Sequence, residues 1–277
     1  MNTDNTDRIS QTFKRLKQQG KTAFVTFISA GDPDVATCQT ILDGLPDAGA
    51  DIIELGMPFT DPSADGPSID KAAQRALKAG ANMQQTLAMV ASFRQHNTTT
   101  PIVLMGYFNP VYAYGTEKFC RDAAGAGVDG LIIVDLPPEE DAELRIPARK
   151  AGLDIIRLIT PTSDADRIKT ITADASGFIY YVAVAGITGE KSSTATLAGQ
   201  AVKRIRQHTD LPVAIGFGIK TPDQARDMAR VCDAAVVGSA IVDRMAASLD
   251  KDGKAGVETS QHTLEFVKQL AAGVKSA

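Results

Sequence analysis

Glu54 closes a short apolar run, DIIEL (51–55), and is the first candidate for chemistry in this chain. Flanked by Ile53 and Leu55, its carboxyl group would be desolvated, which raises the pKa and suits a proton shuttle. An outward-facing salt bridge at the end of the strand explains a glutamate here equally well. The residues around Glu54 leave both interpretations open.

The loop after this run is acidic and stiff, and it belongs to the segment ELGMPFTDPSADGP (54–67). Asp65 precedes Gly66 and Pro67, so it fits a helix cap, and that role is compatible with a catalytic one. Asp61 has a weaker case and fits a turn or a contact with a partner. Proline restricts the unfolded chain, so less entropy is lost when the loop is ordered. The prolines are Pro58, Pro62 and Pro67.

Small residues follow two later apolar runs. The first run ends in Gly216-Phe217-Gly218, and the second ends in Gly238-Ser239. Glycines let backbone N–H groups approach a phosphate, and a helix that begins at Ser239 would favour an anion at its N-terminus. Tight turns alone would explain either pair, but together they favour a phosphate site.

Eight short β-rich runs alternate with segments of helical pattern along the chain. VATCQTILDGL has apolar residues at helical spacing, and TPDQARDMARV begins with a capping Thr221 and with Pro222 at the first helical position. Several runs are apolar on both faces, as in a parallel sheet covered by helices. The predicted strands are 23–29, 51–55, 101–106, 130–135, 154–160, 177–184, 212–217 and 234–239.

This order predicts an α/β fold, a closed (β/α)8 TIM barrel that forms one domain over residues 1–277. An open doubly wound sheet is the alternative, but no GxGxxG follows the first strand. An extra N-terminal helix with Ile9, Phe13 and Leu16 on one face is expected on the outside or the floor of the barrel.

In such a barrel the chemistry lies at the carboxyl ends of the strands, called the top here. Glu54 and Asp135 end strands there, whereas the histidines do not, so we expect no metal site and no histidine base. The lysines at the top, Lys191 and Lys220, are interpreted as solvated charges. General acid–base chemistry by carboxylates and tyrosine remains. The three histidines are His96, His208 and His262.

Composition favours a soluble protein of the cytoplasm. The chain has 277 residues, is 44% hydrophobic and has a net charge of −4, which argues against nucleic acid as a partner. We expect neither a signal peptide nor a transmembrane segment. Cys38, Cys120 and Cys232 are far apart and odd in number, so they are expected to be core residues in a reducing compartment.

Six motifs together resemble the tryptophan synthase α subunit family, in the correct order along the chain. The first is the most specific. Some members have arginine where this chain has Val184, and many have arginine where it has Glu190-Lys191, which affects details of loop closure. The motifs are ELGMPFTDPSADGP (54–67), LMGYFNP (104–110), VDLPPEE (134–140), YYVAVAGITG (180–189), GFGI (216–219) and VVGSAIV (236–242).

The resemblance implies a lyase that splits indole-3-glycerol phosphate into indole and glyceraldehyde 3-phosphate. Glu54 would then shuttle the proton, and Asp65 would accept a hydrogen bond from the indole N–H. No metal or cofactor is implied for this chain; pyridoxal phosphate is expected only in the partner β subunit, within an α2β2 tetramer. The Pro58–Asp61 turn and the segment Phe108–Pro110 are the expected contacts with that partner.

The remaining expected site residues surround the substrate. Tyr180 and Phe217 are candidate pocket walls, although core packing also explains them. The polar segment 189–196 has the composition of a mobile lid or of an ordinary exposed loop, and Thr188 could link it to Asp65. The candidate phosphate-binding residues are Gly189, Gly218, Gly238 and Ser239.

Two other functions remain possible on the residues alone. Another phosphate-binding barrel, such as a sugar-phosphate isomerase or epimerase, would need a metal or a different acid–base pair. A noncatalytic barrel that only activates a partner would have no reason to keep both Glu54 and Asp65.

Overall fold

The structure is a computed structural model that describes residues 7–182, 194–216 and 218–277. Within these residues, nine parallel strands form one sheet, in the order β5-β4-β3-β2-β1-β9-β8-β7-β6. The strands are β1 (Ala23–Ser29), β2 (Ile52–Gly56), β3 (Ile102–Gly106), β4 (Gly130–Ile133), β5 (Asp154–Ile155), β6 (Arg157–Ile159), β7 (Ile179–Val182), β8 (Val213–Gly216) and β9 (Ala234–Val237).

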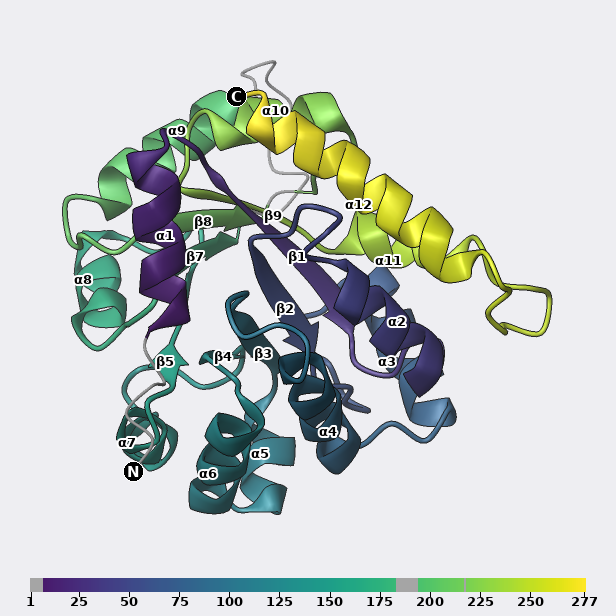
Figure 1. The fold of residues 1–277 in the computed structure, drawn as a ribbon. Coiled ribbons are helices and arrows are strands. Elements are labelled where there is room, and N and C mark those ends of the chain that lie inside the picture. Colours follow the sequence, from purple (N-terminus) through teal and green to yellow (C-terminus); the bar gives the residue numbers. More distant parts are fainter. Residues whose placement is uncertain (1–6, 183–193, 217) are drawn as a thin grey trace.

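Helices connect the strands and form an outer layer around them (Figure 1). The helices are α1 (Arg8–Gln18), α2 (Val35–Gly44), α3 (Pro67–Lys78), α4 (Met83–Arg94), α5 (Phe108–Tyr114), α6 (Thr116–Ala126), α7 (Ala142–Lys150), α8 (Ala165–Ala173), α9 (Thr194–Ile205), α10 (Pro222–Ala229), α11 (Ser239–Ala246) and α12 (Thr259–Lys275). Among the described residues, no helix is both long and apolar enough to span a bilayer.

The two edges of the sheet are parts of one continuous segment, and this closes the barrel. Strand β5 pairs with β4, β6 pairs with β7, and only Ile156 separates β5 from β6 in the chain. The nine strands therefore correspond to the eight predicted ones, the fifth being split. The predicted (β/α)8 barrel is confirmed, and the alternative of an open doubly wound sheet is wrong.

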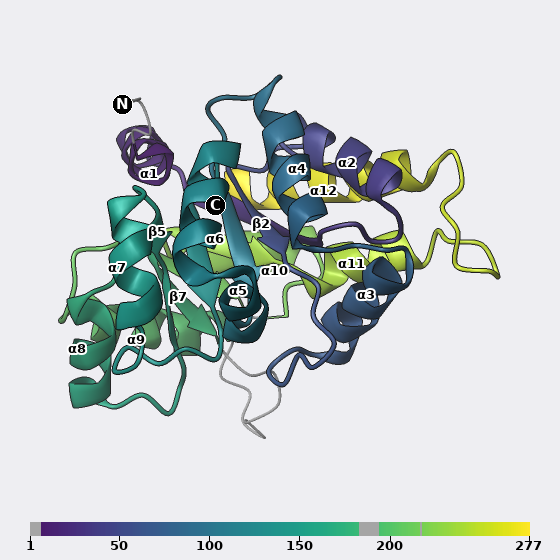
Figure 2. The same cartoon turned by 90° about the horizontal axis from the view of Figure 1, so that it is seen from below.

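Helix α1 covers the floor of the barrel, which decides between the two positions expected for it. Ile9, Phe13 and Leu16 are buried in one cluster with the residues that fill the barrel interior. The rings of Phe13 and Phe178 lie 5.8 Å apart between centroids. Figure 2 shows α1 at this end of the barrel, next to the segment that leads to β5.

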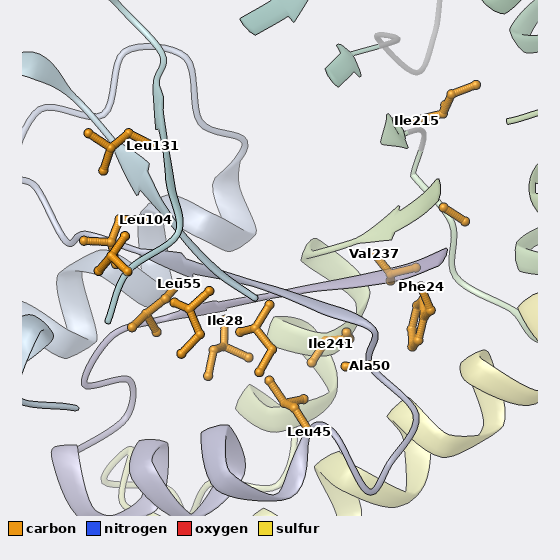
Figure 3. Packing of buried hydrophobic residues seen from close by; sticks show 14 of the residues in the cluster. Phe24, Ile28, Leu45, Ala50, Leu55, Leu104, Leu131, Ile215, Val237 and Ile241 are labelled. Atoms are coloured by element: carbon orange, nitrogen blue, oxygen red, sulfur yellow. The ribbon is translucent and has the colours of Figure 1, made fainter. Parts of the chain in front are cut away.

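The largest part of the core lies between the strands and the outer helices. Figure 3 shows Ile28, Leu55 and Leu104 from β1, β2 and β3 side by side, with Leu45 from the helical layer packed against them. Each strand residue in this layer alternates with one that points into the barrel. The three cysteines are free and buried, as predicted.

Candidate active site

A cavity of about 190 Å³ opens at the top of the barrel, where the strands end. Residues from β1, β2, β3, β7, β8 and β9 line it, together with the loops that follow three of them. The structure thus brings together six of the predicted site residues. They are Glu54, Asp65, Tyr180, Gly218, Gly238 and Ser239.

The Glu54 side chain is buried inside the barrel, so it forms no outward-facing salt bridge. It is 1% exposed, and Oε1 has no hydrogen-bond partner among the described residues. Its parallel neighbour on β1 is Phe27, which lines the same cavity. Burial raises the pKa of Glu54 to about 8. The group therefore carries its proton at neutral pH.

The apolar surroundings of Glu54 come from the barrel and not from its neighbours in the sequence. Ile53 and Leu55 belong to the layer between strands and helices, on the other face of β2. Within the barrel, Ile52 lies below Glu54 in the interior cluster, and Tyr180 is close enough for the charge of Glu54 to raise the tyrosine pKa further. Alternation along the strand explains this arrangement.

Asp65 lies in the loop between β2 and α3 and reaches the cavity from the side. It is half-buried, and it does not cap α3, because Gly66 is the N-cap and makes no side-chain cap bond. Burial raises its pKa, whereas an interaction with the Tyr107 hydroxyl lowers the pKa and the charge of Asp70 raises it. Because Asp65 lines the cavity, a ligand there can contact its carboxyl group.

Three small residues that follow β8 and β9 also line the cavity: Gly218, Gly238 and Ser239. Gly218 has φ +52°, a left-handed conformation that favours glycine. Gly238 is the N-cap of α11 and makes no side-chain cap bond, and Ser239 is the first residue of that helix. The first N–H groups of a helix have no partner within it and favour an anion.

Tyr180 forms part of the cavity wall and fits closely against β8. A Cβ atom built on Gly216 would lie 2.4 Å from the Tyr180 hydroxyl oxygen, so only glycine fits there without a shift. Tyr180 is both a wall of the cavity and a member of the interior core. The two interpretations of this residue are therefore compatible.

Three predicted site residues lie outside the described residues: Thr188, Gly189 and Phe217. The same holds for Val184 and Glu190-Lys191, and for most of the segment 189–196. Their roles stay predictions.

Two residues of the site were missed by sequence reasoning. Lys220 lines the cavity beside Gly218, although it was interpreted as a solvated charge. Tyr107, at the end of β3, contacts the Asp65 loop through its hydroxyl group, which accepts a hydrogen bond from the Ala64 N–H at 3.0 Å. In the sequence, only its position inside the motif LMGYFNP pointed to a role for Tyr107 in the site.

A larger hollow of about 610 Å³ lies at the opposite end, between α1 and the loops that lead into β8 and β9. Its charged groups are exposed or paired; Asp233, for example, pairs with Arg206 at 2.7 Å. The smaller cavity at the top is the better candidate, because an unpaired buried carboxyl group faces it. In the described part of the chain, no three His, Cys, Asp or Glu side chains group in a way that could hold a metal ion.

Comparisons with known proteins agree with the barrel fold. The family model for the tryptophan synthase alpha chain matches residues 13–274. The tryptophan synthase alpha chain from Legionella pneumophila subsp. pneumophila is 36% identical, with a TM-score of 0.86 over 96% of this chain and 97% of the other. The alpha subunit from Legionella pneumophila str. Paris is also 36% identical, with a TM-score of 0.89 over 98% and 99%.

A third similar structure is tryptophan synthase from M. tuberculosis in an aminoacrylate-bound form. It is 31% identical, with a TM-score of 0.84 over 96% of this chain and 99% of the other. The family model and these alignments span nearly the whole chain and include every strand of the barrel. The chain therefore belongs to the tryptophan synthase alpha chain family.

Proposed function

We propose that this chain cleaves indole-3-glycerol phosphate to indole and glyceraldehyde 3-phosphate by carboxylate acid–base catalysis. The observation that carries the proposal is the Glu54 carboxyl group, buried, unpaired at Oε1 among the described residues and facing the cavity that Asp65 also lines. Membership of the tryptophan synthase alpha chain family supports the choice of substrate.

Glu54 acts first as the acid. A protonated Glu54 delivers its proton to C3 of the indole ring, which makes the ring an electron sink. The bond between C3 and the side chain then breaks, and its electrons restore the indole. Meanwhile the side-chain hydroxyl loses its proton and becomes the aldehyde of glyceraldehyde 3-phosphate. Glu54, now a carboxylate, takes that proton, so one group serves both steps. A pKa of about 8 suits this double role.

Asp65 stabilises the charge that grows on the ring. After protonation at C3, the indole nitrogen carries positive charge, and a carboxylate that accepts its N–H stabilises this state more than the ground state. The half-buried position of Asp65 at the side of the cavity allows such a contact.

The substrate phosphate occupies the rim of Gly218, Gly238 and Ser239, with Gly189 expected to join it. Backbone N–H groups at the start of α11 and the small side chains suit this anion. Tyr180, Phe217 and Thr188 complete the pocket around the indole and glycerol parts. No cofactor takes part in this chain, and pyridoxal phosphate belongs to the partner.

We further infer that the partner is a tryptophan synthase β subunit in an α2β2 tetramer, which receives the indole. The top of the barrel offers a suitable surface, because Tyr112 on α5 is 61% exposed and lies with its ring 5.9 Å from that of Phe108. The Pro58–Asp61 turn is partly exposed at the same end. A site in the cytoplasm fits this metabolic role.

The test is an assay of the purified chain with indole-3-glycerol phosphate, in which indole and glyceraldehyde 3-phosphate are both quantified. We expect equal amounts of the two products, and a higher rate when cognate β subunit is added. Sedimentation in parallel reports the complex. Absence of both products under all conditions would overturn the proposal, and a requirement for added metal would point to a different barrel enzyme.

A further inference from the structure

Tyr107 lies where the Asp65 loop meets the end of β3. It follows Gly106, the last residue of β3, and is the N-cap of α5. Its side chain is only 3% exposed. A tyrosine buried to this extent needs partners for its hydroxyl group.

Two contacts join Tyr107 to the loop. The Ala64 N–H donates to the Tyr107 hydroxyl oxygen at 3.0 Å. The ring of Tyr107 lies 5.6 Å from that of Phe59, with an interplanar angle of 36°. Ala64 and Phe59 stand on the two sides of the turn that carries Pro62. One side chain therefore contacts the loop at two separate points.

The Tyr107 hydroxyl also acts on the Asp65 carboxyl group. Since the hydroxyl oxygen already accepts the Ala64 N–H, its own proton is free to interact with a carboxylate. This interaction lowers the pKa of Asp65, against the raising effect of burial. Both side chains line a small cavity of about 20 Å³ beneath the loop.

Other elements hold the remainder of this region. Helix α3, which follows the loop, is anchored by a two-point ion pair in which Arg75 Nε and Nη2 donate to the Asp32 carboxylate at 2.7 and 2.8 Å. The start of α5 is fixed by Asp135, which accepts the Phe108 N–H at 2.8 Å. Tyr107 precedes α5 and contacts the loop that leads into α3, so it connects these two fixed helices.

We propose that Tyr107 is a positioning residue: its hydroxyl group holds the Asp65 loop against the end of β3 and presents the carboxylate to the cavity. Because Tyr107 also begins α5, it couples the expected partner surface at Phe108–Pro110 to Asp65. This inference rests on the proposed function, in which Asp65 acts on the indole N–H.

The charges around Asp65 set the direction of the pH effect. Asp70 on α3 raises the pKa of Asp65, and Tyr107 lowers it. Glu54 and Lys220 line the same cavity. If Asp65 must be ionised, activity falls as the pH drops through its pKa. Loss of the Tyr107 hydroxyl raises that pKa, so the acidic limb of the profile moves to higher pH.

The experiment compares Tyr107→Phe with Tyr114→Phe. Tyr114, the last residue of α5, is a matched control, because its hydroxyl donates to a carboxylate, Asp122, at 2.7 Å but does not line the cavity. We expect Tyr107→Phe to lower kcat about tenfold with little change in KM, and to shift the acidic limb upward. Tyr114→Phe should keep the wild-type kcat and pH profile.

A double variant shows whether Tyr107 acts through Asp65. In an Asp65→Asn background, Tyr107→Phe should lower kcat by less than about twofold, because the two residues act as one unit. An equal loss in both backgrounds would overturn the inference, as would a Tyr107→Phe enzyme with wild-type kcat and acidic limb.

A readout without turnover separates this inference from the proposed function. Carbon-13 NMR of labelled aspartate carboxyl groups, assigned with Asp65→Asn, gives the Asp65 pKa directly. Tyr107→Phe should raise it. If wild-type protein releases no indole, the proposed function fails, while this titration still decides whether Tyr107 holds Asp65; an unchanged midpoint would contradict it.

Discussion

Each end of the barrel buries a carboxyl group, but the two groups differ in their hydrogen-bond and ion-pair partners. At the floor, Asp129 accepts from Arg8 and Arg94 at 2.7 Å each, and the Ile102 N–H also donates to it at 2.7 Å. At the top, Glu54 Oε1 has no partner within the described residues. Burial raises the pKa of both groups, and only at the floor do neighbouring donors oppose that shift.

Two more aspartates at the floor accept backbone N–H groups as Asp129 does, which indicates that these carboxylates stabilise the fold. Asp51 and Asp233 also precede strands, and each accepts a backbone N–H from the start of the adjacent strand, Phe24 and Val213 respectively. Such carboxylates satisfy backbone donors that the sheet leaves open. Two other buried carboxyl groups in the described part of the chain, Asp32 and Asp141, pair with Arg75 and Arg157. Glu54 is buried without an ion pair there, and it lies in the candidate active site.

The largest effect on stability should come from the floor. Asp129→Ala leaves two largely buried arginines without their shared carboxylate, so the free energy of unfolding should fall by about 3–5 kcal/mol. Urea unfolding measures it. The control is Asp122→Ala, which removes an exposed pair with Lys118 and should change stability by less than about 1 kcal/mol. Equal losses would contradict the difference between buried and exposed pairs.

At the top, Glu54→Gln should separate stability from activity. Folding raises the pKa of Glu54 from 4.5 to about 8. Between these two pH values the unfolded chain loses the Glu54 proton while the folded protein keeps it, so the free energy of unfolding falls as the pH rises. The glutamine variant lacks this loss and should be more stable by about 3 kcal/mol at pH 7, with no gain below pH 4.

The same variant should release indole at least about a hundredfold more slowly, because glutamine cannot transfer a proton. Unfolding curves at several pH values and steady-state rates measure the two effects. Glu117→Gln, at an exposed position on α6, is the matched control and should leave both unchanged. Normal turnover in the Glu54 variant would remove this residue from the mechanism.

The third prediction concerns the wall of the top cavity. Gly216→Ala places a Cβ atom 2.4 Å from the Tyr180 hydroxyl oxygen, so it should destabilise the protein by about 1–3 kcal/mol and distort the site. Tyr180→Phe removes that oxygen and should recover part of the loss. Gly125→Ala, in α6 with nothing within 4 Å, should instead be neutral or stabilising. Thermal melting of Gly216→Ala, of Gly216→Ala combined with Tyr180→Phe, and of Gly125→Ala tests the close fit.

The smallest effect is expected at the mouth of the cavity. Lys220 is exposed, and its attraction for the substrate phosphate is screened by water, so Lys220→Ala should raise KM about two- to fivefold without changing kcat. High salt should reduce the difference. The control is Lys251→Ala, because Lys251 is exposed in the loop between α11 and α12 and does not line the cavity. An unchanged KM at low salt would mean that Lys220 is only a solvated charge and does not contribute to substrate binding.

The barrel could be predicted from the alternation of apolar runs and helical patterns, and all eight predicted strands were found. Their ends could not be placed with the same accuracy: the run predicted over 130–135 pairs only over Gly130–Ile133. The split of the fifth strand at Ile156 was not visible either, because pairing with two different neighbours decides it.

The site was harder to predict where orientation matters. DIIEL is buried on both faces, so the sequence could not tell which way Glu54 points; its register with Phe27 decides this. Tyr107 was missed because its role depends on a contact with Ala64, 43 residues away in the chain. Lys220 was set aside because an exposed lysine is usually only a solvated charge.

The most direct test is a carbon-13 NMR titration of labelled glutamate carboxyl groups, with Glu54 assigned by its loss in Glu54→Gln. The central claim is that Glu54 keeps a proton at neutral pH that it can deliver into the cavity. A midpoint near the expected pKa of about 8 supports it. A midpoint near the ordinary glutamate value of about 4.3 would contradict it, because Glu54 would then be ionised at pH 7 and could not act as the acid.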